Sequence, residues 1–363
     1  MDLDRRVDSG PCGQHGSFSL DLSPPFGTLL DSCVQRVLEI SGRDNVSGIF
    51  LGGSFALGEG GVDRESDIPR LIGDVDLLVV VPSLQTHERL YRMRRDLGRA
   101  CEASTNDIEF SGSVDVGVML ASDLESMSPS PFVYDLKHHG VALYGDGGLL
   151  DRIPDYEAGR IGRDEAVTLL QNRIVSFLGS FDASRRFPGD DLHPLLYEIS
   201  KVYTDICTAV LCLSKLYTPG YSSRCERIRE AFGAGKLALP VSGELIESIE
   251  SWTRFKLSPS TRILGDETNP DSMSSRWDVA AGAVLEWWNR CESFLQGREL
   301  EIETGRGVKD LLGRRSAASG MDNLRAWRDL SSAWPMRRKI GLALGLGTRM
   351  FSSNPIELVH EWG

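Results

Sequence analysis

The most constraining feature of this chain is a pair of aspartates directly before an apolar strand. Asp74 and Asp76 stand one residue apart, and the following residues, 77–81, are all apolar. Side chains at positions i and i+2 of a strand point to the same face, so we expect the two carboxylates side by side. Carboxylates this close repel each other unless a cation lies between them. The pattern therefore predicts a divalent metal site at the start of a buried strand.

A glycine turn lies upstream of this pair. An apolar strand over residues 48–51 is followed by Gly52, Gly53 and Ser54. A glycine turn that opens a helix presents free backbone N–H groups, which can hold the β- and γ-phosphates of a nucleotide. Glycine is expected there because a side chain would keep the phosphate away from the backbone. A phosphate-binding turn beside a metal site predicts phosphoryl or nucleotidyl transfer.

A third carboxylate, Asp115, lies in a later apolar strand over residues 113–120. If this strand neighbours the first one in a sheet, Asp115 joins Asp74 and Asp76. Three carboxylates around one point would hold two Mg²⁺ ions, roughly 3.5–4 Å apart. One ion would lower the pKa of an attacking hydroxyl, and the other would hold the triphosphate and the leaving pyrophosphate.

The order of these motifs resembles that of the polymerase-β-type nucleotidyltransferase superfamily: a Gly-Ser turn, Asp-x-Asp on a strand, then a lone Asp on a later strand. The segment FVYDLKHHGVALYGD, residues 132–146, also resembles the end of the catalytic domain in small bacterial members, including aminoglycoside nucleotidyltransferases. The resemblance covers residues 28–150 by motif and the rest only in general layout. It implies Mg²⁺-dependent transfer of a nucleoside monophosphate from an NTP to an acceptor.

The spacing departs from the family in one place. The first family Asp follows the Ser more closely, whereas Asp74 comes twenty residues after Ser54. Asp67 stands at the usual distance, but Pro69 then occupies the place of the second Asp, and a central strand disfavours proline. We therefore interpret Asp74 and Asp76 as the ligands and the intervening residues as an insertion in the active-site loop.

Other interpretations of the acidic residues stay open. An Asp-x-Asp before a strand is often a turn or a helix cap, and Asp115 could be an exposed acid on an edge strand. Asp107 and Glu109 precede the same strand and compete for the place of the third ligand. The glycine turn ahead and Asp115 behind together favour the metal site.

A later helical segment carries Glu198, Lys201 and Asp205 at spacings of three and four, so the three share one helical face. A salt-bridged surface face is the common explanation of such a pattern. By the resemblance, however, Lys201 would neutralise phosphate charge and Glu198 would act as base for the acceptor hydroxyl. Three residues after this helix could contact a nucleotide, although core or surface roles fit better: Tyr217, Tyr221 and Arg224.

The hydrophobic pattern divides the chain in two. Strands and helices alternate to about residue 150, which predicts an α/β (α+β) nucleotidyltransferase core with a mixed, mostly antiparallel sheet. Beyond residue 159 apolar residues recur at helical spacing only, which predicts an all-helical bundle, with the active site in the cleft between the two. The expected divisions are a mobile arm 1–24, a catalytic domain 25–150, a helical domain 160–300 and a basic helical segment 301–363. Expected strands are 48–51, 75–81, 113–120 and 140–146, and expected helices 25–46, 84–104, 132–139, 163–181, 195–216, 224–232, 243–255 and 276–295.

The net charge of −12 argues against a protein that grips the backbone of nucleic acid. A small hydroxylated molecule is therefore our first choice of acceptor. A basic stretch over residues 306–349 keeps a macromolecular acceptor open, a tRNA end or a protein side chain. A third hypothesis is a module that binds nucleotide without catalysis, because the long loop before Asp74 could displace the metal geometry.

Seven cysteines, an odd number, include no Cys-x-x-Cys pair, and the polar N-terminal residues have no apolar signal core. Both features favour free thiols in a reducing cytoplasm. A run of 18 apolar residues that could span a membrane is missing from the sequence. We expect Trp287 and Trp288 to pack between helices rather than to hold a ligand.

Overall fold

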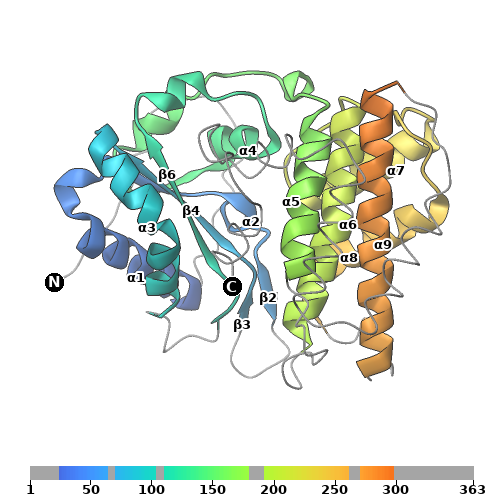
Figure 1. The fold of residues 1–363 in the computed structure, drawn as a ribbon, viewed down its shortest axis with the longest axis horizontal. Helices are drawn as coiled ribbons and strands as arrows, with labels where there is room; N and C mark the ends of the chain where they lie inside the picture. Colours follow the sequence, from blue (N-terminus) through green and yellow to red (C-terminus); the bar gives the residue numbers. More distant parts are fainter. Residues whose placement is uncertain (1–23, 64–69, 104–109, 180–191, 261–269, 298–363) are drawn as a thin grey trace, which may run out of the picture.

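The computed structural model describes residues 24–63, 70–103, 110–179, 192–260 and 270–297, which form a sheet layer and a group of long helices (Figure 1). The main sheet has four strands in the order β6-β4-β1-β7. β4 runs parallel to β6, and β1 runs antiparallel to both β4 and β7. The predicted α/β fold with a mixed, mostly antiparallel sheet is thus confirmed. The strands are β1 (Gly48–Leu51), β4 (Val75–Val81), β6 (Val114–Leu120) and β7 (Val141–Gly145).

Both faces of this sheet are covered, which explains why β4 is apolar from Leu77 to Val81. Alternate residues of β4, beginning at Val75, pack in a core with α1 (Pro24–Ser41) and α3 (Leu84–Glu102). The intervening residues Leu78 and Val80 pack in a second core with α4 (Pro131–His139) and the 3₁₀ helices η2 (Asp123–Ser126) and η3 (Gly147–Arg152). Asp76 shares the parity of Leu78 and therefore belongs to the α4 face.

A second, smaller sheet was not anticipated. Its strands β2 (Gly61–Asp63), β3 (Arg70–Ile72) and β5 (Phe110–Ser111) lie in the order β2-β3-β5. The segment between Ser54 and Asp74, interpreted above as a loop insertion, thus contains two paired strands. Ile72 at the end of β3 packs into the core of the helical layer. Asp67, Asp107 and Glu109 lie outside the described residues.

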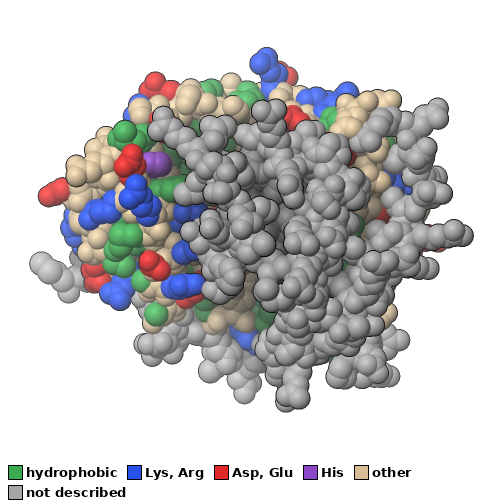
Figure 2. Space-filling model, in the orientation of Figure 1, with side chains coloured by type: hydrophobic (Ala, Val, Ile, Leu, Met, Phe, Trp, Pro, Cys, Tyr) green, Lys and Arg blue, Asp and Glu red, His purple; other side chains and the backbone are tan. Residues whose placement is uncertain are grey.

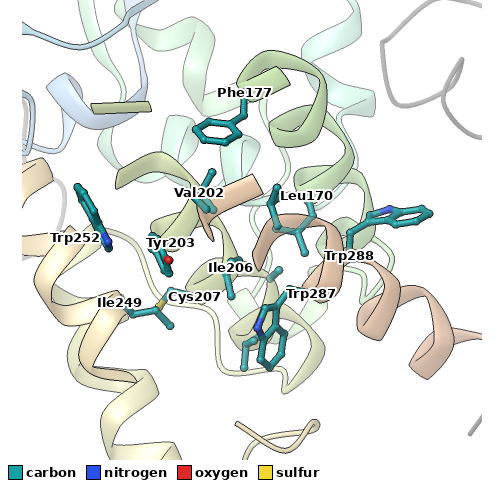
Figure 3. Close-up of a cluster of buried hydrophobic side chains, with 14 of the residues drawn as sticks. Leu170, Phe177, Val202, Tyr203, Ile206, Cys207, Ile249, Trp252, Trp287 and Trp288 are labelled. Carbon is teal, nitrogen blue, oxygen red and sulfur yellow. The ribbon is translucent and has the colours of Figure 1, made fainter. Parts of the chain in front are cut away.

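The helical layer consists of helices packed around α6, the most buried of them. Nearly every residue of α6 from Leu196 to Leu213 is buried, because α5, α7, α8 and α9 pack against it. Figure 3 shows this core, in which Tyr203 stacks on Trp252 with ring centroids 5.9 Å apart. Trp287 and Trp288 are buried in the same core, so the prediction of packing is confirmed. The helices are α5 (Glu165–Gly179), α6 (His193–Leu213), α7 (Tyr221–Gly233), α8 (Gly243–Leu257) and α9 (Pro270–Leu295).

Most element boundaries follow the sequence pattern, and the exceptions have local causes. The first helix ends at Ser41, not at residue 46, because Gly42 has a positive φ of 83° that interrupts the helix. The same helix begins at Pro24, inside the predicted N-terminal arm. The rest of that arm and the basic segment 301–363 lie outside the described residues, and the domain boundaries stay a prediction. Among the helices described here, none is long and apolar enough to cross a membrane.

Candidate active site

The parallel pairing of β4 and β6 brings the predicted acidic residues together. Asp76 and Asp115 are direct partners in the register of the two strands. Val75 and Val114, which precede them, both point into the core with α1 and α3, so the aspartates point to the opposite face. Asp74 stands immediately before β4 with the same parity as Asp76. The expected adjacency of the two strands is confirmed.

Asp74 is held by one partner from each layer. Its Oδ1 accepts a hydrogen bond from Ser113 Oγ at 3.0 Å, and its Oδ2 accepts a short hydrogen bond from Lys201 Nζ of α6. Burial acts to raise the pKa of Asp74, but the Lys201 ammonium outweighs it, and the pKa is lowered. Asp74 is therefore the ionised anchor of the helical layer on the sheet.

Asp76 lies against the glycine turn and has no such anchor. A Cβ on Gly53 would stand 1.9 Å from Asp76 Oδ2, so the carboxylate occupies the space that a side chain at Gly53 would fill. Burial, followed by the charges of Asp74 and Asp115, raises the pKa of Asp76 to about 7. Asp115 is exposed, yet desolvation and then the charge of Asp74 raise its pKa as well. The negative charge of Asp74 thus adds to burial in raising the pKa of both Asp76 and Asp115.

The side chains do not form a finished metal site as they stand. Within the described ranges, no group of three or more His, Cys, Asp and Glu side chains is placed to hold a metal ion. The Asp74 carboxylate faces the Lys201 ammonium instead of its neighbours. The strands place the acidic residues next to one another, but their carboxylate oxygens do not point to a common position that a metal ion could occupy.

The glycine turn differs in detail from the expectation. The Gly52 N–H donates to the carbonyl oxygen of Asp76 at 2.8 Å and so continues the β1–β4 ladder, which corrects the view that all the amides of the turn are free. Gly53, at φ 61°, opens the short helix α2 (Gly53–Ala56), and its amide and that of Ser54 belong to the first turn, which has no intrahelical acceptors. Glycine is required at position 53 because of this φ and because of the Asp76 carboxylate.

The face of α6 that carries Glu198, Lys201 and Asp205 is not a surface face. Lys201 and Asp205 are buried, and the Lys201 ammonium donates to Glu198 Oε1 at 2.7 Å in addition to Asp74. Arg173 of α5 donates from Nε to Asp205 Oδ2 at 2.7 Å and from Nη1 to Glu198 Oε2 at 3.5 Å. The helical pattern therefore supplies a charged network directed at the start of β4.

Lys256 of α8 is a residue that sequence analysis missed. It is only 2% exposed and donates to Tyr197 Oη at 2.7 Å. Burial, followed by the charge of Lys201, lowers the pKa of Lys256 to about 7. Its position, seven residues after the buried Ile249, is the one signal that could have indicated burial.

Lys256 belongs to an alternating series of cations and tyrosine rings, which we call the cation–tyrosine stack. Its neighbouring members lie 5.0, 4.0, 4.9, 4.6 and 5.5 Å from cation to ring centroid. Tyr217 at one end donates to Asp135 Oδ1 of α4 at 2.7 Å, and Lys201 at the other end reaches Asp74. The stack therefore joins the helical layer to the sheet layer at two points. In order, it consists of Lys201, Tyr197, Lys256, Tyr221, Arg224 and Tyr217.

Glu59, which follows the glycine turn, makes another link that the sequence did not indicate. Its carboxylate accepts hydrogen bonds from the backbone N–H groups of Tyr221 at 2.5 Å and Ser222 at 3.1 Å, and so caps the start of α7. The Glu59 N–H donates to the carbonyl oxygen of Ser54 at 2.8 Å. The glycine turn and α7 are thus connected through one residue.

Figure 2 shows one face of the molecule, on which lysine and arginine side chains are interspersed with acidic ones near α1 and α3. Several arginines of α3 have local partners, for example Arg94, which lies 4.2 Å from the Tyr91 ring centroid, and Arg99, which pairs with Asp96. Among the described residues of this side, charges of both signs are therefore mixed.

In this fold the glycine turn, Asp76 and Asp115 lie side by side at the start of β4 and β6. No family model and no curated protein matches the chain. Among solved structures, it is similar to the spectinomycin adenyltransferase AAD(9) from Enterococcus faecialis, solved with ATP and spectinomycin. The identity is 12% and the TM-score 0.39, over 70% of this chain and 98% of that chain. A likeness this distant carries no argument about function, which therefore rests on the chain's own residues.

Proposed function

We propose that this chain is a Mg²⁺-dependent nucleotidyltransferase that moves a nucleoside monophosphate from an NTP to a hydroxyl group of a small molecule and releases pyrophosphate. One observation carries the proposal: Asp76 and Asp115 lie in register on parallel strands beside Asp74, with a glycine turn packed against Asp76. Clustered carboxylates next to backbone amides are the combination that metal-assisted phosphoryl transfer requires.

The charge balance of the site supports a bound cation. In the described site, five carboxylates lie near three cations, which leaves an excess of two negative charges. Burial first, and then this negative charge, raise the pKa of Asp76, and a divalent cation would offset the charge. Carboxylate oxygens are also the ligands that Mg²⁺ prefers. The groups concerned are Asp74, Asp76, Asp115, Glu198 and Asp205 against Arg173, Lys201 and Lys256.

We assign the metal to Asp74, Asp76 and Asp115. A pair of Mg²⁺ ions there would lower the pKa of the acceptor hydroxyl and neutralise the triphosphate. Asp76 is fixed for this role by its contact with Gly53, and Asp74 by its hydrogen bond from Ser113. The exposed position of Asp115 leaves that side of the cluster open to solvent and ligand.

The triphosphate is assigned to Gly53, Ser54 and Lys201. The amides of Gly53 and Ser54 would donate to phosphate oxygens, while Gly52 contributes the backbone path rather than its own N–H, which is already bonded. The Lys201 ammonium, already directed at Asp74, would neutralise negative charge on the phosphates.

Glu198 is assigned as the base that takes the proton of the acceptor hydroxyl. It lies next to Lys201, so an acceptor bound there would face the same cluster of carboxylates. Both of its oxygens accept hydrogen bonds from cations, one from Lys201 and one from Arg173. These partners would fix the direction of the carboxylate.

A small hydroxylated acceptor remains the choice that the acidic net charge favours. We also propose a cytoplasmic location, which the free thiols of the described cysteines support. The experiment that tests the function is incubation of the purified protein with Mg²⁺, each radiolabelled NTP and a panel of aminoglycosides, nucleosides, tRNA and protein. Transfer of label that is lost in an Asp74→Asn/Asp76→Asn variant would support the assignment. Binding of NTP without transfer or pyrophosphate release would contradict it and favour a nucleotide-binding module.

A further inference from the structure

Large apolar side chains are exposed at a few positions of the described residues, and one of these positions adjoins the candidate active site. Phe132 of α4 is 46% exposed. Its Cε2 lies 3.5 Å from the position that a Cβ on Gly52 would take, and Asp76 Cβ lies 3.9 Å from that same point. The ring is therefore beside the end of β1, where the glycine turn begins. The exposed large apolar residues are Leu84, Phe132, Phe232, Val279 and Leu295.

The position of this ring is set by the rest of α4. Val133 and Leu136 are buried in the core under the sheet, while Asp135 receives the hydrogen bond from Tyr217. The start of the helix is capped by Ser130, whose Oγ accepts the N–H of Val133 at 3.2 Å. These contacts fix α4 both to the sheet and to the helical layer. Phe132 therefore lies next to the glycine turn as a fixed aromatic surface open to solvent.

A planar ring in this place suits a planar ligand group. Aromatic side chains bind nucleobases by stacking, which tolerates any base because every base has a π-face. A nucleotide with its phosphates at Gly53 and Ser54 has its base attached through a single sugar, which keeps the base within one sugar's reach of the glycine turn and of the ring beside it. Glu198, the residue that we assign to the acceptor, is on α6 and bonded to Lys201, whereas Phe132 is on α4 beside Gly52.

We propose that Phe132 is the stacking platform for the nucleobase of the NTP, an inference that rests on the proposed nucleotidyltransferase function. Stacking without hydrogen bonds to base edges discriminates little between bases. Phe132 therefore contributes affinity to ATP, GTP, CTP and UTP alike, and any preference among them comes from other residues.

Isothermal titration calorimetry with two probes tests this proposal. The probes are ATP and inorganic tripolyphosphate, each with Ca²⁺ in place of Mg²⁺ to limit turnover. In Phe132→Ala we expect ATP affinity to fall about 10-fold, tripolyphosphate affinity to stay unchanged, and GTP affinity to fall by a similar factor. Phe132→Trp should retain ATP affinity. Phe232→Ala, which removes another exposed phenylalanine, 40% exposed on α7, is the matched control and should leave both affinities unchanged.

The outcomes separate this inference from the function on which it rests. Unchanged ATP affinity in Phe132→Ala would overturn the stacking role while leaving the nucleotidyltransferase proposal intact. An equal loss of ATP and tripolyphosphate affinity would also overturn it, because a disturbed glycine turn would then be the cause. A change only in the KM of the acceptor would reassign the ring to the acceptor. Absence of binding of both probes by the parent protein would refute the proposed function and this inference with it.

Discussion

Replacing Asp76 by Asn should stabilise the protein in the absence of divalent cations, although it removes a proposed metal ligand. Burial, followed by the charges of Asp74 and Asp115, raises the pKa of the Asp76 carboxyl group from 3.8 to about 7. In the unfolded chain the same group ionises near 3.8 and meets no such repulsion. The folded state therefore holds a proton between these pH values that the unfolded state has lost.

The sign and size of the effect follow from this difference. Because the folded pKa is raised, stability falls as pH rises from 3.8 to 7, by about 1.4 kcal/mol for each pKa unit. A shift of this size gives a penalty of at most about 4 kcal/mol above pH 7 and less than about 2 kcal/mol at pH 5. Asp76→Asn removes the charge and hence the penalty. Asp74→Asn acts in the opposite direction, because it removes the ion pair with Lys201 that lowers the pKa of Asp74.

Urea unfolding at pH 5 and pH 8 in EDTA measures both changes. We expect Asp76→Asn to exceed the parent in unfolding free energy at pH 8, with a smaller gain at pH 5, and Asp74→Asn to fall below the parent at pH 8. Added Mn²⁺ should stabilise the parent more than either variant, since a cation that binds the folded state alone shifts the equilibrium towards it. A destabilised Asp76→Asn at pH 8, or a gain that does not depend on pH, would refute the electrostatic reasoning.

Three further substitutions test other parts of the site. The first is Lys256→Met. Between pH 7 and 10.5, Lys256 is protonated in the unfolded chain but not in the folded protein, so the stability of the parent rises with pH in this range. In urea unfolding, the stability of Lys256→Met relative to the parent should therefore fall from pH 7 to 9. Gly53→Ala should lose at least about 1–2 kcal/mol of stability, and its Mn²⁺ binding, measured by calorimetry, should also be lost. The control Gly52→Ala should be tolerated, because the new Cβ would lie 3.5 Å from its nearest neighbour atom, Phe132 Cε2. Arg173→Met removes the ion-pair partner of the buried Asp205 carboxylate and should cost about 3–5 kcal/mol in urea unfolding. The exposed control Arg36→Met should cost under about 1 kcal/mol, and similar losses in both variants would contradict this account.

The sheet and its acidic residues were accessible from the sequence because their patterns are strong. The apolar run after Asp76 fixes the position of β4, and the alternation around Asp115 fixes that of β6, so both strands were found with at most one residue of error. The short strands β2, β3 and β5 have two or three residues each, too few for a period to be detected. A feature of that length is determined by its partners, which a local pattern does not contain.

The charged groups behind the carboxylates were harder to predict for a different reason. Lysine and arginine are rarely buried, so their residue type alone assigns Lys256 and Arg173 to the surface. Their burial depends on carboxylates and tyrosines from other helices. The role of Gly53 was also only half predicted, since the expected reason was room for a phosphate and the observed contact is with Asp76.

The contact of Glu59 with α7 has a mechanical consequence. The carboxylate holds the first amides of α7, and the backbone of the same residue is hydrogen-bonded to Ser54 in the glycine turn. Glu59 therefore links the turn to the helix by hydrogen bonds at both of its ends, which restricts movement of one relative to the other. A ligand that displaces the turn has to pull α7 with it or break these bonds. Faster hydrogen exchange at the amides of Tyr221 and Ser222, on a helix remote in sequence, would then report a ligand that displaces the turn at Ser54.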